Sequence, residues 1–265
     1  MRVVSLSPSI TEVLFALGLD KEIVGVTRYC DYPKEATTKS KVGGYYDPSY
    51  EAILALEPDL VILIVQHEEA VRKLSAVGIR TVTVDDSRVE GILDGIQTIG
   101  QVCGRETNAA AIVSDLKARM GAIRKRTAGK AKPSVLLCIS RAMGTGGLKD
   151  VYVAGLDGFY SVLLEKAGGE TAYRRDTPKF PMLSREGILE LNPDVIIDLA
   201  ADLDRTKYSV NDVMAEWKAV AGVNAVRKGR VHVLVEDYIT VPGPRFILLL
   251  EQLARILHPE IDWEQ

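Results

Sequence analysis

The stretch SYEAILALEPDLVIL, residues 49–63, has a second version in the same chain, SREGILELNPDVIID at residues 184–198. Eight of the fifteen aligned positions are identical, and the copies are 135 residues apart in a chain of 265. In each copy a serine can cap a short helix with apolar residues at helical spacing, and a proline follows the helix end. The continuous apolar run that closes each copy is typical of a strand buried on both faces of a parallel sheet. The repeat predicts two α/β halves of similar plan.

Other segments follow the same offset. Strand patterns at residues 2–6 and 134–139 open the two halves, and RTVTVDD (80–86) resembles RVHVLVED (230–237). Helical patterns cover residues 9–17, 68–77, 89–102, 160–167, 210–220 and 245–257. For the first of these helices we expect a capping box of Ser9 and Glu12 and a stop at Gly18. Alternating strands and helices predict an α/β fold with two Rossmann-like lobes and mostly parallel sheets.

Residues 106–126 have apolar side chains at helical spacing and charged residues elsewhere, which indicates one long helix. We expect this helix, within residues 105–128, to connect a first lobe of residues 1–104 to a second lobe of residues 129–265. A single stiff connector favours a ligand cleft between the lobes that closes by only a small hinge motion.

Composition excludes several classes of function. The formal net charge of −3 and the dispersed basic residues do not favour nucleic acid as a partner. No apolar run approaches the roughly 20 residues of a membrane-spanning helix. We expect Cys103 and Cys138 to be buried apolar residues and not a disulfide.

Candidate binding residues follow the predicted strands, because ligands of open α/β sheets bind beyond the carboxyl ends of the strands. Ser9 lies in a helix-start segment that could receive a polar ligand group or serve only as a cap. Four loop tyrosines can recognise a large planar or polar ligand, or pack over a core edge: Tyr29, Tyr32, Tyr45 and Tyr46. His67 follows the repeated strand, and Arg245 begins the last helix, where it could meet a carboxylate or phosphate.

Enzyme chemistry has little support in the sequence. The glycine-rich segment at residues 144–147 matches no nucleotide fingerprint, and the three histidines are too far apart in sequence to suggest a metal centre. Cys30 and His67 could be imagined as nucleophile and base, but nothing in the sequence places them together. We expect a non-enzymatic protein with no catalytic residues, no resident metal and no cofactor.

Several ordered segments together resemble one family. These segments are RVVSLSPSITEVLFALGL, VGVTRYCDYP, KVGGYYDPSYEAILALEPDLVIL, LSREGILELNPDVIID, GRVHVL and PGPRFILLLEQLARILHPE. They resemble the helical-backbone class of substrate-binding proteins of ABC importers, and within it most closely the cobalamin-binding branch. The resemblance spans nearly the whole chain and implies capture of a corrinoid, cobalamin or cobinamide, for delivery to a membrane permease.

The resemblance also implies site residues. The first lobe would contribute Pro8, Ser9, Tyr29, Tyr45 and Tyr46, with Gln66 and His67 at the edge of the cleft, and the second lobe Phe159, Tyr238 and Arg245. Acidic residues on the two lobes would dock onto permease arginines. Glu68 matches the first docking position, and Asp202 or Asp204 the second.

Alternatives remain. Relatives that carry heme or a ferric siderophore imply an iron chelate as ligand, with Arg245 pairing its carboxylates and Tyr29 as a possible iron ligand. From a different class, a nucleotide-sugar transferase also has two α/β lobes. We expect a monomer that acts in the periplasm or another extracytoplasmic space, its signal peptide absent from this chain; a cytosolic location is not excluded by the sequence.

Overall fold

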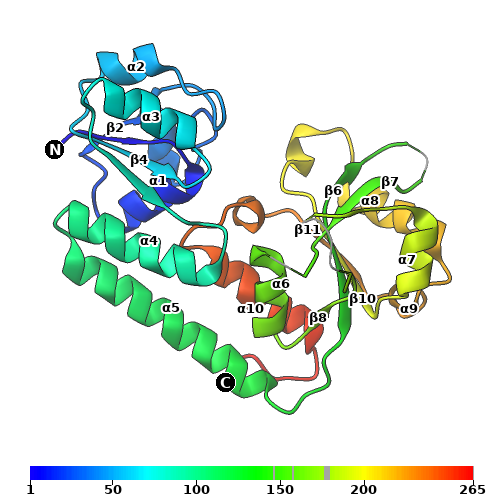
Figure 1. Ribbon diagram of the computed structural model, residues 1–265. Coiled ribbons are helices and arrows are strands. Elements are labelled where there is room, and N and C mark those ends of the chain that lie inside the picture. The colour runs from blue at the N-terminus through cyan, green and yellow to red at the C-terminus, as the bar shows by residue number, and fades with distance from the viewer. Residues whose placement is uncertain (146, 157, 176–179, 265) are drawn as a thin grey trace. The chain divides into compact units, whose positions relative to one another are not determined.

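The computed structural model describes residues 1–145, 147–156, 158–175 and 180–264. The chain divides into two compact units (Figure 1). The first unit contains Met1–Lys117 and Val241–Pro244, and the second contains Ala118–Thr240 and Arg245–Gln265. The division falls inside one continuous helix of 22 residues, α5 (Glu106–Thr127), which confirms the long helix expected from the sequence.

The first unit is built on a five-stranded parallel sheet with strand order β3-β2-β1-β4-β5. Its strands are β1 (Val3–Ser5), β2 (Ile23–Val26), β3 (Ser40–Lys41), β4 (Leu60–Ile64) and β5 (Thr81–Val84). Its helices are α1 (Pro8–Ala16), the 3₁₀ turn η1 (Lys34–Thr38), α2 (Tyr50–Ala55), α3 (Glu68–Ala76) and α4 (Val89–Val102), followed by the start of α5. Figure 1 shows α2 and α3 on one side of the sheet and α1 and α4 on the other.

The core of this sheet explains the apolar run in the first copy of the repeat. All five residues of β4 are buried, since helices cover both faces of the strand. On the α2 and α3 side, Val61 and Leu63 pack in one cluster with Ile53 and Leu74. The apolar residues of the first copy therefore form a central strand that packs between two layers of helices.

The second unit has a mixed sheet of six strands in the order β11-β10-β6-β7-β9, with β8 pairing β6. Its strands are β6 (Ser134–Ala142), β7 (Lys149–Val153), β8 (Glu170–Thr171), β9 (Met182–Leu183), β10 (Val195–Leu199) and β11 (Val231–Leu234). Its helices are α6 (Phe159–Lys166), α7 (Arg185–Leu191), η2 (Leu203–Arg205), α8 (Val210–Glu216), η3 (Trp217–Val220), α9 (Asn224–Arg227), η4 (Asp237–Thr240) and α10 (Phe246–Leu257). Strand β7 runs antiparallel to β6 and β9, a pairing that the sequence did not predict.

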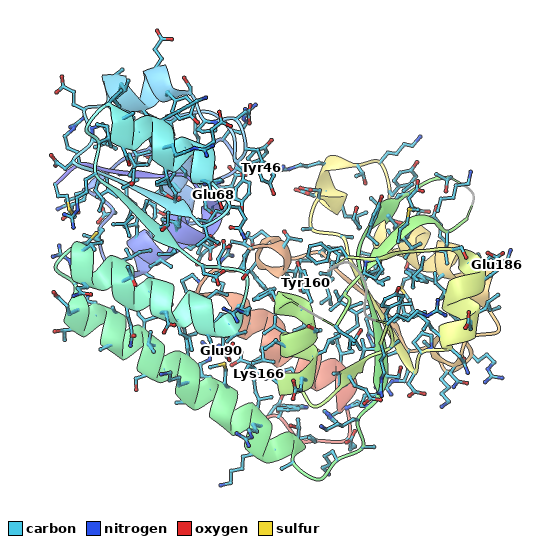
Figure 2. All side chains as sticks on the ribbon, in the orientation of Figure 1. Tyr46, Glu68, Glu90, Tyr160, Lys166 and Glu186 are labelled. Carbon is cyan, nitrogen blue, oxygen red and sulfur yellow. The ribbon has the colours of Figure 1, made fainter. Side chains whose placement is uncertain are left out.

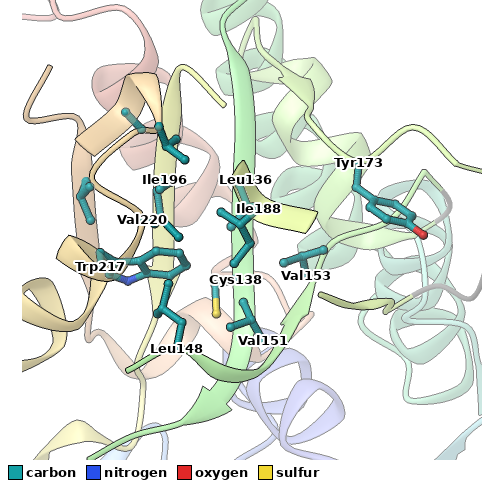
Figure 3. Close-up of a cluster of buried hydrophobic side chains, with 13 residues drawn as sticks. Leu136, Cys138, Leu148, Val151, Val153, Tyr173, Ile188, Ile196, Trp217 and Val220 are labelled. Atoms are coloured by element: carbon teal, nitrogen blue, oxygen red, sulfur yellow. The ribbon is translucent and has the colours of Figure 1, made fainter. Parts of the chain in front are cut away.

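Figure 3 shows a buried cluster of this second sheet, in which Trp217 packs beside Ile196 and Val220. Cys138 belongs to the same cluster, and Cys30 and Cys103 are also buried free thiols. The expectation that Cys103 and Cys138 are buried without a disulfide is confirmed.

The capping box expected at Ser9 and Glu12 is wrong. Helix α1 begins at Pro8 with Ser7 at the N-cap, and no side chain caps it. Proline suits the first turn because its fixed φ angle is helical. It also lacks an N–H, and an N–H at that position would have no hydrogen-bond partner within the helix. The helix therefore starts one residue earlier than expected, so the Ser9 hydroxyl lies inside the first turn and is available for another contact. The expected stop is observed, since Gly18 follows the helix in the left-handed region at φ 73°.

Candidate ligand-binding site

The first sheet has a switch point between β1 and β4, where the order of its strands reverses direction. The two strands are parallel, with Val3 opposite Leu60 and Ser5 opposite Ile62. Loops that leave such neighbouring strands diverge, and the crevice between them is the usual ligand site of an open parallel sheet. Two predicted site segments leave at this point: Pro8 and Ser9 after β1, and Gln66 and His67 after β4.

Ser9 forms a hydrogen bond with a residue of the loop after β5. Its hydroxyl donates to Asp86 Oδ2 over 2.8 Å, and because its proton is used there it accepts the hydroxyl of Ser7 over 2.7 Å. Ser7, Ser9 and Asp86 are all buried. The contact fixes a carboxylate at the carboxyl end of the sheet. Sequence reasoning did not include Asp86 among the site residues, although the acidic pair that ends RTVTVDD was a signal for it.

Tyr45, Tyr46 and His67 form an aromatic group beside these loops. The ring of Tyr45 meets Tyr46 edge-on at 4.6 Å between centroids and His67 at 4.9 Å. Tyr46 is 82% exposed, and Figure 2 shows it in the first unit near Glu68. Burial raises the pKa of Tyr45, and the nearby charge of Asp86 raises it further. The hydroxyl of Tyr45 is therefore neutral and available as a hydrogen-bond donor.

His67 is unusual because it is buried without a polar partner. Only 7% of its surface is exposed, and neither ring nitrogen has a hydrogen-bond partner among the described residues. Burial lowers the pKa of His67; the backbone of Tyr45 partly offsets this effect without meeting hydrogen-bond geometry. The imidazole is thus neutral near pH 7, with a lone pair on one nitrogen that could accept a hydrogen bond or bind a metal ion carried by a ligand.

Tyr29 lies in the loop after β2 and is 52% exposed. The guanidinium of Arg28 lies 5.7 Å from the centre of its ring and also forms an ion pair with Asp47. This pair joins the Tyr29 loop to the loop of Tyr45 and Tyr46. The ion pair requires a glycine at position 44. A Cβ there would come within 2.0 Å of Asp47 Oδ1 and 2.7 Å of the Arg28 guanidinium.

At the start of α3, Gln66 and Glu68 are both exposed. In the second unit, Asp202 and Asp204 are also exposed, after β10, and Asp202 forms an ion pair of 3.4 Å with Arg205. The four residues thus follow β4 and β10, the two strands that end the copies of the repeat.

The second unit has a cavity of about 150 Å³ at the carboxyl ends of β6 and β10. Its wall includes Arg141, which lies within β6 with its side chain 2% exposed. Arg141 Nε donates to Asp198 Oδ2 over 2.8 Å, and the indole N–H of Trp217 donates to the same oxygen over 2.8 Å. Arg141 also forms an ion pair with Glu216. Buried charges in such a paired network fix the cavity wall.

The other predicted residues of the second unit are placed as follows. Arg245 is already paired with a carboxylate, since its Nη1 lies 2.8 Å and 3.0 Å from the two oxygens of Asp237. The guanidinium also lies 5.7 Å from the ring of Tyr238. Phe159, the first residue of α6, is 7% exposed and meets Tyr160 edge-on at 5.2 Å.

Within the described part of the chain, no three histidine, cysteine or carboxylate residues are grouped so that they could hold a metal ion. No helix of that part is both long enough and apolar enough to cross a bilayer.

The fold and these loops define a two-unit α/β binding protein, and comparison with known proteins identifies its family. Residues 3–238 match the family described as periplasmic binding protein, so the chain belongs to that family. It is an ABC transporter substrate-binding protein of the type that carries vitamin B12, heme or siderophores, a class of non-enzymatic transport components.

Among curated relatives, the chain is 31% identical over 270 residues to the uncharacterized ABC transporter substrate-binding lipoprotein YvrC of Bacillus subtilis, which covers 98% of this chain and 80% of the relative. It is also 31% identical over 258 residues to the vitamin B12-binding protein of Salmonella choleraesuis, with coverage of 97% and 90%. Among solved structures, the periplasmic heme-binding protein RhuT of Roseiflexus sp. RS-1 in apo form matches with a TM-score of 0.83 at 26% identity, covering 97% of this chain and 98% of that chain. These matches show the transport class that the sequence predicted and leave no support for the transferase alternative.

Proposed function

We propose that this protein captures a corrinoid, cobalamin or cobinamide, and delivers it to the permease of an ABC importer. The ligand would contact the loops at the carboxyl ends of the parallel strands in each unit. The 31% identity to a vitamin B12-binding protein over nearly the whole chain supports this ligand class.

The observation that carries the proposal is the pairing of Arg245 with Asp237. A corrinoid presents mainly neutral amide groups around its ring, whereas heme and many ferric chelates present carboxylates. Carboxylates are recognised by available guanidinium groups. Since the Arg245 guanidinium is already neutralised, and that of Arg28 is paired with Asp47, these arginines favour an amide-bearing ligand.

The loops that carry Tyr29, Tyr45 and Tyr46 would supply a surface complementary to the corrinoid. The rings of Tyr45, Tyr46 and Tyr29 offer flat apolar area, and their hydroxyl groups can exchange hydrogen bonds with amides. The network that holds Ser9 against Asp86, and the pair that joins Arg28 to Asp47, fix these loops before a ligand arrives. A preformed site binds with a smaller cost of ordering.

The test is an equilibrium titration of the full chain with cyanocobalamin, cobinamide, hemin and a ferric hydroxamate. We expect one-to-one binding of a corrinoid near or below micromolar dissociation constant. Tyr46→Ala should weaken this binding about tenfold or more, a loss within the usual range for a buried aromatic contact. Tyr152→Ala removes an exposed tyrosine of β7 that is not among the candidate site residues, and it should leave the affinity unchanged. Binding of hemin or the hydroxamate without corrinoid binding would overturn the ligand and keep the transport class.

His67 supports a second candidate, a heme or another iron chelate. Its imidazole is neutral, has no hydrogen-bond partner among the described residues and lies against Tyr45, so it has a free lone pair for the metal of a carried ligand. If hemin is the cargo, its visible spectrum should shift on binding, and His67→Ala should abolish the shift. A spectrum that does not change on binding would contradict a metal contact by His67.

For delivery, we propose that Glu68 and either Asp202 or Asp204 dock onto cationic residues of the permease. These carboxylates are exposed and follow the same strand of the repeat in each unit. The protein would act as a monomer, because both units would contribute one docking carboxylate each, and it would act outside the cytoplasm.

A further inference from the structure

A second pocket, distinct from the loops described above, lies between α5, α10 and the C-terminal segment within the second unit. Its volume is about 190 Å³. Its walls include three arginines, Arg119, Arg126 and Arg255, with Glu251, Ile123 and Trp263. Three guanidinium groups and one carboxylate give these walls a net charge of +2.

The charges of this pocket are only partly balanced. Arg119 is held by Glu251 in a two-pronged contact, with Nε–Oε1 at 2.8 Å and Nη2–Oε2 at 2.9 Å. Neither Arg126 nor Arg255 forms an ion pair with a carboxylate of the residues that the structure describes. Two like charges that converge on one half-enclosed pocket repel each other, and an anion bound between them would remove the repulsion.

An aromatic wall completes the pocket. The Arg126 guanidinium lies 5.7 Å from the ring centre of Trp263 and donates from Nη1 to the Asp262 carbonyl over 3.2 Å. The indole N–H of Trp263 donates to the His258 carbonyl over 3.1 Å, which fixes the ring against the end of α10. Arg126 is thereby oriented by this hydrogen bond and by its contact with the Trp263 ring, and its remaining N–H groups can still donate.

We propose that this pocket binds a phosphate group through Arg126 and Arg255. The planar donor fork of arginine matches the oxygens of phosphate, and the Trp263 ring gives an apolar wall for the organic part of a phosphate ester. The phosphate can come from free inorganic phosphate or from the headgroup of an anionic phospholipid. This site is independent of the corrinoid proposal, because it uses none of the strand-end loops.

The first experiment is calorimetric titration of the full chain with inorganic phosphate at constant ionic strength. We expect saturable binding, accompanied by a change in tryptophan fluorescence from Trp263, since the other tryptophan, Trp217, is fully buried. The double variant Arg126→Gln/Arg255→Gln should weaken binding tenfold or more. Arg124→Gln/Lys125→Gln removes the same charge from exposed positions of α5 outside the pocket, and it should leave binding unchanged.

The second experiment is cosedimentation with phosphatidylglycerol vesicles and with phosphatidylcholine vesicles. Binding to phosphatidylglycerol alone, lost in the first double variant and kept in the second, would identify the headgroup as the source. Phosphate binding without vesicle binding would identify the free anion.

Absence of binding in both experiments, or an equal loss in the two double variants, would overturn the proposal. Should the first double variant unfold, the single variant Arg255→Gln serves instead. Its side chain is exposed on α10 and holds no carboxylate of the described residues, and the expected loss is then at least threefold.

Discussion

Arg141 and Asp198 form a buried ion pair, with Nε and Oδ2 2.8 Å apart and side chains 2% and 3% exposed. Asp198 occupies the last position of the second copy of the repeat, where the first copy has Leu63. Both residues are buried in a central strand, but Leu63 packs in an apolar cluster, whereas Asp198 accepts hydrogen bonds from Arg141 and Trp217. The two halves thus share a backbone plan and fill one equivalent position with opposite chemistry.

Asp198→Leu, which copies the first half, should destabilise the protein by about 3–5 kcal/mol, because it leaves the Arg141 guanidinium buried with one of its carboxylates lost. Urea unfolding measures this change. The double variant Arg141→Met/Asp198→Leu should recover at least half of the loss, since it removes both buried charges. Glu69→Gln, at an exposed ion pair with Lys73, should leave the unfolding midpoint unchanged. A loss no larger for Asp198→Leu than for this control would contradict the role of the buried pair.

His67 should make stability depend on pH. Burial lowers its folded-state pKa below the ordinary 6.5, so the unfolded chain binds a proton more readily than the folded chain. The contribution of His67 to stability is therefore fully present above pH 6.5 and is lost as the pH falls through 6.5 toward the folded pKa. His67→Phe keeps an aromatic ring against Tyr45 and should flatten this decline, measured by urea unfolding between pH 5 and pH 7.5.

His232 should contribute to the same pH dependence. Burial and, to a smaller extent, Arg230 also lower its pKa, so it contributes a decline of the same sign. His67→Phe and His232→Phe should each remove one part of the decline, and the double variant should remove both. A pH profile that neither substitution changes would show that other groups govern the acid sensitivity.

The two serines that begin the copies of the repeat should contribute equally. Ser49 Oγ accepts from the Ala52 N–H and Ser184 Oγ from the Gly187 N–H, each over 3.2 Å. Substitution of either serine by alanine should cost about 1 kcal/mol, and by glycine a few tenths, because glycine lets water reach the helix end. Thermal unfolding of the four variants measures the effect. A clear difference between the two alanine variants would show that the helices differ in their packing and not in their caps.

If Glu68 and either Asp202 or Asp204 dock onto the permease, their substitution should abolish transport without weakening ligand binding. Glu68→Ala/Asp202→Ala should keep the corrinoid affinity and abolish uptake in a reconstituted system with the permease. Glu68→Ala/Asp204→Ala distinguishes the two candidate positions in the second unit, and the pair that stops uptake identifies the docking residue.

The repeat supplies the control for docking. Glu51→Ala/Glu186→Ala removes one exposed carboxylate from each unit at the equivalent position of α2 and α7, the helices that precede β4 and β10. Uptake should be normal in this variant. Uptake by Glu68→Ala/Asp202→Ala and Glu68→Ala/Asp204→Ala that matches the control would rule out these docking roles.

The sequence determined the elements of the fold because their signals are local. Helix α4 has the bounds that its apolar spacing predicted, and the apolar runs of the repeat became the buried strands β4 and β10. The length of α5 and the buried state of the cysteines also followed from spacing and composition. Helix spacing and buried runs depend on neighbouring residues, so one sequence is enough to locate them.

Only the tertiary structure decided which side chains share a site and which charges are already paired. Ser9 meets Asp86 across 77 positions, Arg141 meets Asp198 across 57, and Arg245 is occupied by Asp237. The first two contacts were not predictable from spacing, because strand order brings loops from distant parts of the chain to one edge of a sheet. The burial that leaves His67 neutral likewise depends on the packing of Tyr45 over it, which no local pattern in the sequence contains.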